Sequence, residues 1–416
     1  MKDRILLKWY NSKAALRIWI VLIPVFLVVF FIGLQGILGS VFPPLDFLGF
    51  ISAKKLSAFV RELVLYTSKR VTVDLLLIAL GIWGIYVAVK RALYSVLTVL
   101  KPSNKEDFVG TVYERLKLTR GPVVTVLGGA AGLMPVLHGL KKYTNNINAV
   151  ILPSEKNIRS AMLALSDAGS LNKLFGYNFA GTKLSEFNLG DLYIKAMTEV
   201  AGDTERALSE SANVFSLAGR IYPLVKDRAA LEYTTDGGRK ITEESSLLCG
   251  NLTVKAVGLQ AASGRANEKV LELIKTSDAV VLGPGSLYAD ILPFFLVKGV
   301  SEALFASRGI KIFVPALMAL KYEPGKPVVS RQVKTILAYA KKPVIDAVVV
   351  NEKELPEEAL VIYRRYRSVG YIVDDTALKE LGIRVVKRGM GRLTEDGFIR
   401  HDPQALGRAL IKLISI

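Results

Sequence analysis

One short stretch, AVVLGPGSLYADILP at residues 279–293, limits most strongly what this chain can fold into. Four apolar residues enter two glycines and a serine, and a helical pattern leaves them. In an α/β protein this order indicates a buried strand, a tight glycine loop and a helix N-terminus, whose backbone N–H groups favour anions. An ordinary turn, in which the glycines only relieve backbone strain, explains the same letters. The stretch alone therefore leaves both interpretations open.

A second unit of the same kind begins at Gly121. Residues 122–127 predict a buried strand, Gly-Gly-Ala-Ala-Gly follows at 128–132, and residues 133–140 predict a helix. Strands and helices then alternate to the end of the chain, which predicts a Rossmann-like, doubly wound, mostly parallel sheet covered by helices on both faces. Short alternating runs at 221–260 predict a small β-rich insertion. The other expected strands are 148–152, 311–314 and 347–350, and the other expected helices are 157–165, 190–200, 204–217, 268–275, 296–307, 331–340 and 402–416.

The N-terminal part has the pattern of a membrane hairpin. Residues 18–39 carry no charge, and 22 residues in a helix span about 30 Å of hydrocarbon. A signal peptide is the alternative, but no small-residue cleavage site follows. Residues 71–89 form a second apolar run with one charge, Asp74, which we expect at the membrane interface rather than in a buried relay.

Basic residues at both outer flanks predict that both ends of the hairpin face the cytoplasm. The expected location is therefore the inner membrane, as a multi-pass protein with a cytoplasmic C-terminal domain. The expected organisation is a membrane hairpin at 1–91, a linker at 92–120, and an α/β domain at 121–416 with its β-rich insertion at about 221–260.

The charge and the few metal-binding residue types narrow the function. A net charge of +18 without a nucleic-acid reader motif favours anionic lipid head groups over nucleic acid as the partner. The single cysteine, Cys249, permits no intrachain disulfide and fits a reducing compartment. With only His138 and His401 besides, a Cys/His zinc site is not expected.

Several stretches between residues 121 and 416 resemble the YvcK/CofD-like family, which holds the bacterial gluconeogenesis factor proteins and the 2-phospho-L-lactate transferases. The resemblance is closer to the YvcK side. It implies a Rossmann-like domain that binds a nucleotide-type ligand at the carboxyl edge of its sheet. The stretches that carry it are Val126–Lys141, Asn188–Asp191 with Ala196–Thr198, Arg220 with Pro223, Leu282–Glu302, and Ile399–Pro403.

The resemblance implies a set of candidate ligand-binding residues from three loops. The two glycine loops supply most of them, and the segment Asn188-Leu189-Gly190-Asp191 borders the same cleft. The candidates are Gly128, Gly129, Gly132, Asn188, Gly190, Asp191, Gly283, Gly285 and Ser286.

The chain also departs from the family pattern, and each departure removes polar chemistry. The acidic, Gly/Ser-rich segment that usually follows the second strand is missing. Ala130 and Ala131 stand where the family usually has Gly and Thr, Phe187 replaces a His, and the Asn/Gln-bearing segment after the strand at 311–314 reads PALMAL. We therefore expect no metal site, Mg²⁺ included, and assign no catalytic residue.

The remaining titratable candidates have simpler interpretations beside the functional ones. Asp191 is the best remaining carboxylate for a ligand contact, although the dipole at a helix N-terminus also favours an acid at this position. His138 suits a surface or phosphate-proximal position, His401 with Asp402 suits a helix cap, and Asp374-Asp375 suits a solvated turn.

Three functions remain open at this point. The first is a membrane-anchored regulator that binds a nucleotide or UDP-sugar, linked to carbon metabolism or to cell-envelope and cell-shape control. The second is a CofD-type transferase of a phosphate-containing group from a nucleotide donor, and the third is a non-catalytic membrane scaffold with an empty site. A site closed by Ala130, Ala131 and Leu317 would favour the scaffold. The expected partners are the membrane, the nucleotide-type ligand and a second copy of the chain in a homodimer.

Overall fold

The computed structural model describes residues 21–35, 37, 71–100, 118–166, 169–179, 188–226, 229–249, 252–261 and 264–415. The chain divides into two compact units, Met1–Phe108 and Val109–Ile416, which are treated one at a time. In both units, secondary structure follows the hydrophobic pattern of the sequence closely.

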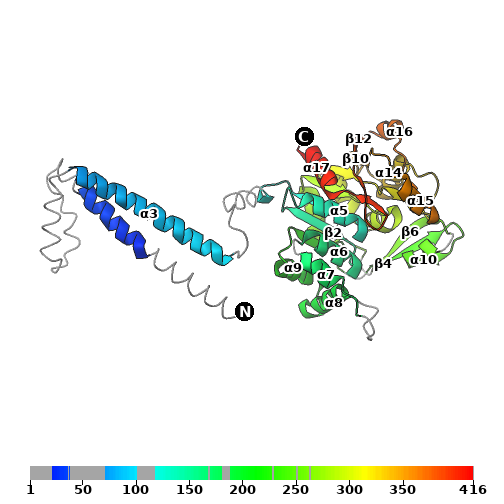
Figure 1. Cartoon of the computed structure of the whole chain (residues 1–416). Coiled ribbons are helices and arrows are strands. Elements are labelled where there is room, and N and C mark those ends of the chain that lie inside the picture. The colour runs from blue at the N-terminus through cyan, green and yellow to red at the C-terminus, as the bar shows by residue number, and fades with distance from the viewer. Residues whose placement is uncertain are drawn as a thin grey trace. The chain divides into compact units, whose positions relative to one another are not determined.

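The first unit contains two apolar helices that run antiparallel, side by side (Figure 1). Helix Val21–Gln35 packs on α3 (Val71–Leu100) through glycines. A Cβ on Gly84 would lie 2.1 Å from the ring of Phe26, and one on Gly81 would lie 2.7 Å from Cβ of Phe30. Glycine at these positions therefore lets the two helices approach closely.

Among the described residues, one helix is long and apolar enough to cross a membrane, Val73–Arg91, while Val21–Gln35 is shorter. Of the two membrane spans predicted at 18–39 and 71–89, only the second coincides with a helix of sufficient length. Within the first, residues 18–20, 36, 38 and 39 lie outside the described residues. Asp74, near the start of this helix, is only 1% exposed, so neighbouring parts of the chain bury it. Its expected position at the membrane interface stays a prediction.

The second unit is built on a seven-stranded sheet in the order β12-β10-β8-β7-β1-β2-β3. All neighbouring strands in it are parallel, which confirms the predicted doubly wound architecture. The strands are β1 (Val124–Leu127), β2 (Ile147–Ile151), β3 (Arg220–Pro223), β7 (Ala279–Leu282), β8 (Ile310–Phe313), β10 (Ala347–Asn351) and β12 (Arg384–Arg388).

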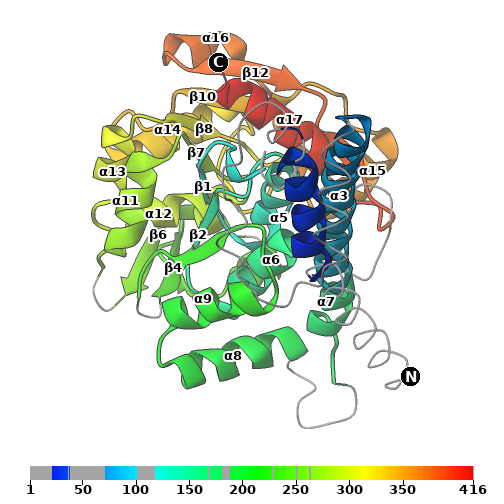
Figure 2. The ribbon, with the colours of Figure 1, turned by 90° about the vertical axis from the view of Figure 1, so that its left-hand side faces the viewer.

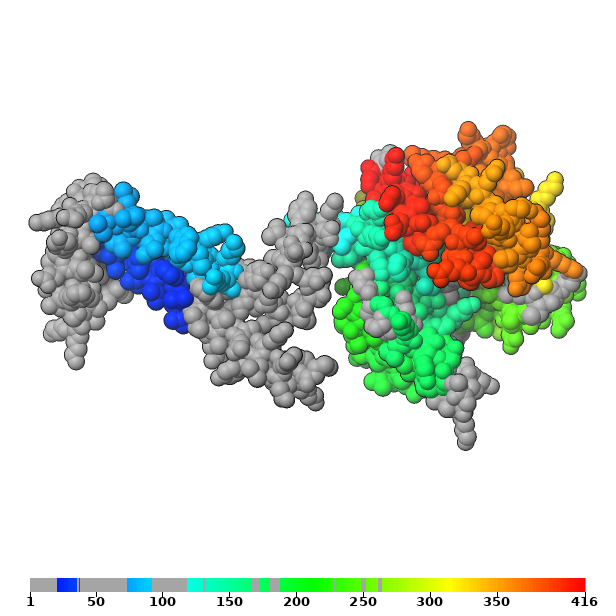
Figure 3. Space-filling model, viewed as in Figure 1, coloured from blue at the N-terminus to red at the C-terminus, as the bar shows by residue number. Residues whose placement is uncertain are grey.

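Helices cover both faces of this sheet, as Figure 2 shows. One face carries α5 (Ala130–Leu140), α6 (Glu155–Leu165), α7 (Gly169–Phe175), α8 (Leu189–Ala201), α9 (Thr204–Val214) and α17 (Pro403–Ile414). The other carries α11 (Glu268–Thr276), α12 (Leu292–Phe295), α13 (Val300–Ala306), α14 (Val329–Ala340) and α16 (Asp375–Glu380). α17 lies directly on α5 (Figure 3), and a Cβ on Gly139 would come within 2.1 Å of the carbonyl oxygen of Pro403.

The β-rich insertion is a three-stranded antiparallel sheet in the order β5-β4-β6. Its elements are β4 (Ala229–Thr235), β5 (Lys240–Ile241), α10 (Glu244–Cys249) and β6 (Val254–Ala261). The predicted insertion began at residue 221, but Arg220–Pro223 pairs with β2 in the main sheet because its apolar residues are buried there. The remaining short elements are η2 (Leu287–Ile291), β9 (Met318–Ala319), α15 (Glu357–Arg365), and β11 (Val369–Gly370), β13 (Gly391–Leu393) and β14 (Ile399–His401).

Two helices begin at other residues than the sequence predicted, and both differences affect the site. The helix expected at 133–140 already begins at Ala130, so Gly132 lies inside α5 rather than in the turn before it. The helix expected at 296–307 begins only at Val300, because Gly299 adopts φ +98° at its N-cap and interrupts the pattern.

Candidate functional site

The strand order reverses between β1 and β7. After β1 the chain continues outward to β2 and β3, and after β7 it continues in the opposite direction to β8, β10 and β12. β1 and β7 pair in parallel, with Leu127 opposite Leu282. In open α/β sheets, ligands bind in the crevice beyond the carboxyl ends of the strands at such a reversal. Both glycine loops, at 128–132 and 283–286, leave the sheet there.

The glycines allow the two loops to touch. A Cβ on Gly132 would lie 1.3 Å from the carbonyl oxygen of Pro284, and one on Gly128 would lie 3.8 Å from Cα of Gly283. Gly283 has φ +84°, a conformation that favours glycine. The first glycine loop therefore serves close packing, whatever else it does.

A carboxylate that the sequence prediction missed lies between the loops. Asp290, in η2, is so close that a Cβ on Gly129 would lie 1.5 Å from its Oδ1 and one on Gly285 2.6 Å from its Oδ2. The backbone N–H of Ser286 donates to Asp290 Oδ2 at 2.9 Å. Burial raises the pKa of Asp290 to about 6, opposed by this hydrogen bond and aided by the nearby carboxylate of Glu244.

The expectation of free N–H groups in the second loop is wrong for Ser286, Leu287 and Ala289. The N–H of Leu287 donates to Glu323 Oε1 at 3.3 Å, and the N–H of Ala289 donates to Oγ of Ser286 at 3.3 Å. With Ser286 N on Asp290, the N–H groups of Ser286, Leu287 and Ala289 all have acceptors inside the chain. The carboxylates of Asp290 and Glu323 thus take the place that an external anion would occupy at this loop.

The candidate hydroxyl of Ser286 belongs to a buried hydrogen-bond chain. Tyr322 donates to Glu244 Oε1 at 2.7 Å, and the Ser286 and Tyr322 oxygens are 2.9 Å apart. Because Tyr322 gives its proton to Glu244, Ser286 donates to Tyr322. Burial also raises the pKa of Glu323 to about 7, partly opposed by the hydroxyl of Tyr371, which donates to it.

Positive charge also lies near Asp290. Lys156, in the first turn of α6, lowers the pKa of Asp290 by its charge and is exposed. The N-cap residue of α5 is Gly129, which has no side chain to accept from the first N–H groups of the helix. An uncapped helix N-terminus with a lysine beside it favours a phosphate group.

The third group of candidates forms a closed cap on α8. Oδ1 of Asn188 accepts from the N–H of Asp191 at 2.9 Å, and Nδ2 of Asn188 donates to Asp191 Oδ2 at 2.6 Å. Asp191 also pairs with Arg159 of α6, against which Gly190 packs. Asn188, Gly190 and Asp191 are thus bonded to one another and to α6, one turn along from Lys156, rather than to the glycine loops.

The other singled-out residues have structural positions. His138 lies in the last turn of α5, about 12 Å along the axis from its first residue, so it is not near the glycine loop. His401 is buried, which lowers its pKa to about 4, and Asp402 caps α17 by accepting from Gln404 and Ala405, as predicted.

The structure describes only some of the other residues that the sequence analysis singled out. Asp374 accepts from Ser330 at the start of α14 and Asp375 pairs with Lys387, so the expectation of a solvated turn is wrong. Leu317 is half-buried. Phe187 and the side chains of Ala130 and Ala131 lie outside the described residues.

Within the described ranges, no three His, Cys, Asp or Glu residues gather in a way that would hold a metal ion. The acid nearest the glycine loops is Asp290, which one N–H already occupies. The described residues therefore do not form a dedicated metal cage.

Fold and site together define a Rossmann-like α/β domain with paired glycine loops at its switch point. The family description "2-phospho-L-lactate transferase CofD" matches residues 124–390. A protein of Nostoc sp. with the gluconeogenesis factor name is 30% identical over 342 residues, covering 77% of this chain and 75% of that protein. The gluconeogenesis factor of Bacillus subtilis is 27% identical over 317 residues, covering 70% of this chain and 98% of that protein.

A solved structure from Bacillus halodurans, a member of the UPF0052 family, matches with a TM-score of 0.65 and 27% identity, covering 69% of this chain and 98% of that one. The chain belongs to the CofD/YvcK family.

Proposed function

We propose that this chain is a membrane-anchored regulatory member of the CofD/YvcK family that binds a nucleotide or nucleotide-sugar. The observation that carries the proposal is the meeting of both glycine loops at the strand-order reversal between β1 and β7. That crevice is where doubly wound proteins bind such ligands. Regulation rather than transfer is proposed because no group of three His, Cys, Asp or Glu residues that could hold a metal ion accompanies the loops in the described residues.

The ligand phosphate would bind beside the first loop. The uncapped N-terminus of α5 and the side chain of Lys156 supply the favourable charge. Ionised Asp290, wedged against Gly129 and Gly285, opposes it. Because burial holds the pKa of Asp290 near 6, protonation just below neutral pH removes this repulsion. Phosphate affinity would then rise as the pH falls through 6.

The membrane anchor is part of the proposal. Val73–Arg91 has the length and composition of a spanning helix. Close packing on helix Val21–Gln35 through Gly81 and Gly84 is the mode that membrane helices favour, since small residues let their backbones approach. The basic residues Lys90 and Arg91 at the end of that span favour a cytoplasmic α/β domain.

The names of the relatives support a link to carbon metabolism. Because we place the α/β domain at the inner membrane surface, we extend the proposal to cell-envelope or cell-shape control through partner proteins. A homodimer would allow one ligand to act on two anchored domains.

The proposal is tested by isothermal titration of the full chain in detergent with UDP, a UDP-sugar and GDP, without divalent metal. We expect binding of at least one of them, and about tenfold tighter binding by Asp290→Asn at pH 7.5, because the variant removes a facing charge. The gain should shrink at pH 5.5. Asp236→Asn, an exposed acid in the turn after β4, is the control. Absence of binding to all three by both proteins would overturn the proposal.

A CofD-type transferase is the alternative, favoured by the single observation that a carboxylate, Asp290, reaches both glycine loops. Mg²⁺ is commonly bound by one or two carboxylates together with substrate phosphates. With Mg²⁺ present, the transferase predicts weaker binding and lost turnover in Asp290→Asn. The regulator predicts that Asp290→Asn still binds more tightly and that neither protein turns over.

A further inference from the structure

The seven-stranded sheet ends in two different edges. At one end lies β3, where Leu224 N–H donates to Ile151 of β2, so the neighbouring Pro223 faces outward and has no N–H to offer. At the other end lies β12, at the top of the sheet in Figure 2. An edge strand presents unpaired backbone groups to an extended chain. β12 is therefore the edge at which a further strand can be added.

The hydrogen bonds to β10 show which backbone groups of β12 face outward. Arg384 N–H donates to the carbonyl oxygen of Asp346 at 3.0 Å, and the carbonyl oxygen of Arg388 accepts an N–H from the end of β10 at 3.0 Å. Along a parallel strand, the backbone groups of successive residues alternate between the two sides. The N–H groups of Val385 and Lys387 therefore point away from the sheet.

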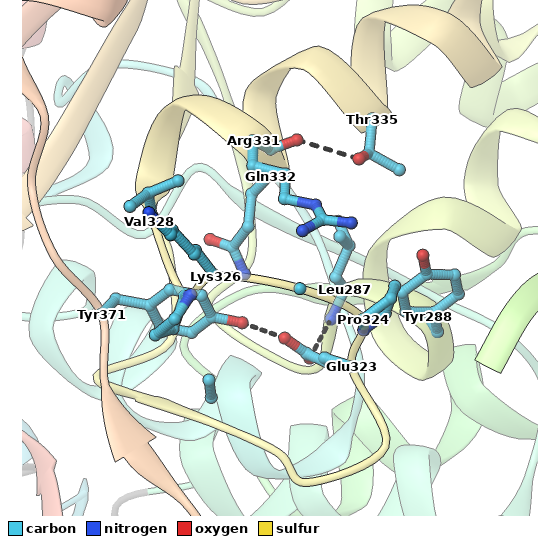
Figure 4. A pocket seen from close by; sticks show the side chains of 13 residues that line it. Leu287, Tyr288, Glu323, Pro324, Lys326, Val328, Arg331, Gln332, Thr335 and Tyr371 are labelled. Atoms are coloured by element: carbon cyan, nitrogen blue, oxygen red, sulfur yellow. Dashed lines mark hydrogen bonds between the residues drawn. The ribbon is translucent and has the colours of Figure 1, made fainter. Parts of the chain in front are cut away.

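These two outward N–H groups have no acceptor among the described residues. Backbone donors near the glycine loops are occupied instead, as where Leu287 N–H donates to Glu323, which also accepts from Tyr371 (Figure 4). The helix that leads into β12, α16, packs on one face of the sheet through its buried Leu378. The outward side of β12 is therefore unpaired.

Positive charges flank this edge. Arg384 and Arg388 are exposed, and neither forms an ion pair with the described residues. Their side chains share a face with the partly buried Val386, and four residues of a strand separate them by about 13 Å. On the opposite face, Lys387 pairs with Asp375 of α16. The edge thus presents one apolar residue between two unpaired arginines.

A second copy of the chain is a poor partner for this edge. If two β12 strands paired antiparallel about a two-fold axis through Val386, Arg384 of each copy would lie opposite Arg388 of the other. Like charges directly opposite are destabilising, and charges on an edge strand are a common protection against self-association. The same two charges favour a different strand, one that carries acids opposite them.

We propose that β12 is a docking edge for an extended acidic segment of another protein, which adds to the seven-stranded sheet as a further strand. The segment reads acid, any residue, apolar, any residue, acid. Its acids lie beside Arg384 and Arg388, and its apolar residue lies beside Val386. Its carbonyl oxygens accept from the N–H groups of Val385 and Lys387. In strand addition, main-chain hydrogen bonds give affinity and alternate side chains give specificity.

The experiment is fluorescence anisotropy of labelled peptides titrated with the full chain in detergent. The peptide Thr-Glu-Thr-Val-Thr-Glu-Thr carries the proposed pattern, and Thr-Lys-Thr-Val-Thr-Lys-Thr reverses its charges. We expect the acidic peptide to bind about tenfold more tightly at low salt, because two exposed charge pairs form in one complex and two repulsions in the other. High salt should reduce this difference, since it screens exposed charges.

Variants separate the charges from the backbone. Arg384→Gln combined with Arg388→Gln should weaken the acidic peptide about tenfold. Arg239→Gln, at an exposed arginine between β4 and β5, should not change its affinity.

Val385→Pro removes one outward N–H, and an edge strand tolerates proline where the N–H faces solvent. It should weaken the acidic peptide about tenfold, by loss of that hydrogen bond and by the bulk of the ring. Circular dichroism and melting verify the fold of each variant. The glutamine variants change only exposed side chains, so they test the proposal even if Val385→Pro does not fold.

Equal affinity for the two peptides, no binding of the acidic peptide, or unchanged affinity in the double glutamine variant or in folded Val385→Pro would overturn the proposal. A dimer that Val385→Pro converts to monomers would also overturn it, because a second copy would then occupy the edge. β8 and β10 separate β12 from β7, so Asp290→Asn should leave peptide affinity unchanged. Failure here would therefore leave the nucleotide proposal standing, and the reverse also holds.

Discussion

Replacing Asp290 by Asn should stabilise the α/β domain at neutral pH. In the folded chain the pKa of Asp290 is about 6, against a model-compound value of 3.8. Each pKa unit corresponds to about 1.36 kcal/mol. Ionised Asp290 therefore costs the folded state about 3 kcal/mol at pH 7.5. Asparagine has the same shape and still offers an oxygen to Ser286 N–H, so it should recover most of this energy.

The pH dependence gives the sharper test. Because the folded pKa is raised, the cost is absent below about pH 4, where both states are protonated, and grows between about pH 4 and 6. The gain from Asp290→Asn should fall from about 3 kcal/mol at pH 7.5 to about 1 kcal/mol at pH 4.5.

Melting of the full chain in detergent at both pH values measures this difference. One kcal/mol shifts the melting temperature by about 2–4 °C in a domain of 150–250 residues, and by less in a larger one. Asp236→Asn, in an exposed turn, should change little at either pH. A lower melting temperature for Asp290→Asn at pH 7.5, or an equal gain at both pH values, would refute a partly buried, ionised Asp290.

Three further substitutions test close packing and helix capping in the α/β domain. Gly132→Ala should lower the melting temperature by several degrees, because its Cβ would lie 1.3 Å from the Pro284 carbonyl oxygen. Overpacking of this kind costs about 1–3 kcal/mol or more. Gly237→Ala is the control, since no atom lies within 4 Å of the added Cβ. Asn188→Ala should cost about 1 kcal/mol as a lost cap and leave nucleotide affinity in titrations unchanged, whereas a large loss of affinity would make Asn188 a ligand contact. Asp402→Ala should cost about 0.5–2 kcal/mol for the cap of α17, and unchanged melting would contradict that role.

The sheet and both glycine loops were predictable because their signals are local. Buried parallel strands such as β1 and β7 are continuous apolar runs, and glycines follow each one. β12 escaped prediction because it lies at the edge of the sheet and reads Arg-Val-Val-Lys-Arg, with charges at both ends. A short half-buried strand of this composition has no distinctive pattern.

The role of Asp290 was not predictable from local pattern. Its position four residues after Ser286 is ordinary for the first turn of a helix, where acids are common. Its contact with Gly129 requires that β1 and β7 be neighbours, although they are far apart in the sequence. Asn188 and Asp191 were predicted as ligand contacts, and the structure shows them capping α8. The sequence could not separate these two roles, because a ligand motif and a helix cap have the same spacing.

In the proposed site, Lys156 and Asp290 would together determine how strongly the crevice binds a phosphate, and a last prediction separates their roles. The positive charge of Lys156 lowers the pKa of Asp290. In Lys156→Gln, the pKa of Asp290 should therefore rise above 6, and the pH at which the stabilisation by Asp290→Asn levels off should move upward with it. If both side chains face the same phosphate, Lys156→Gln should weaken nucleotide binding less in the Asp290→Asn background than in the wild type, since a neutral Asn permits the phosphate to settle on the N-terminus of α5. Strictly additive effects on affinity in this double-mutant cycle, with no shift in the pH midpoint, would mean that the two charges do not share a ligand.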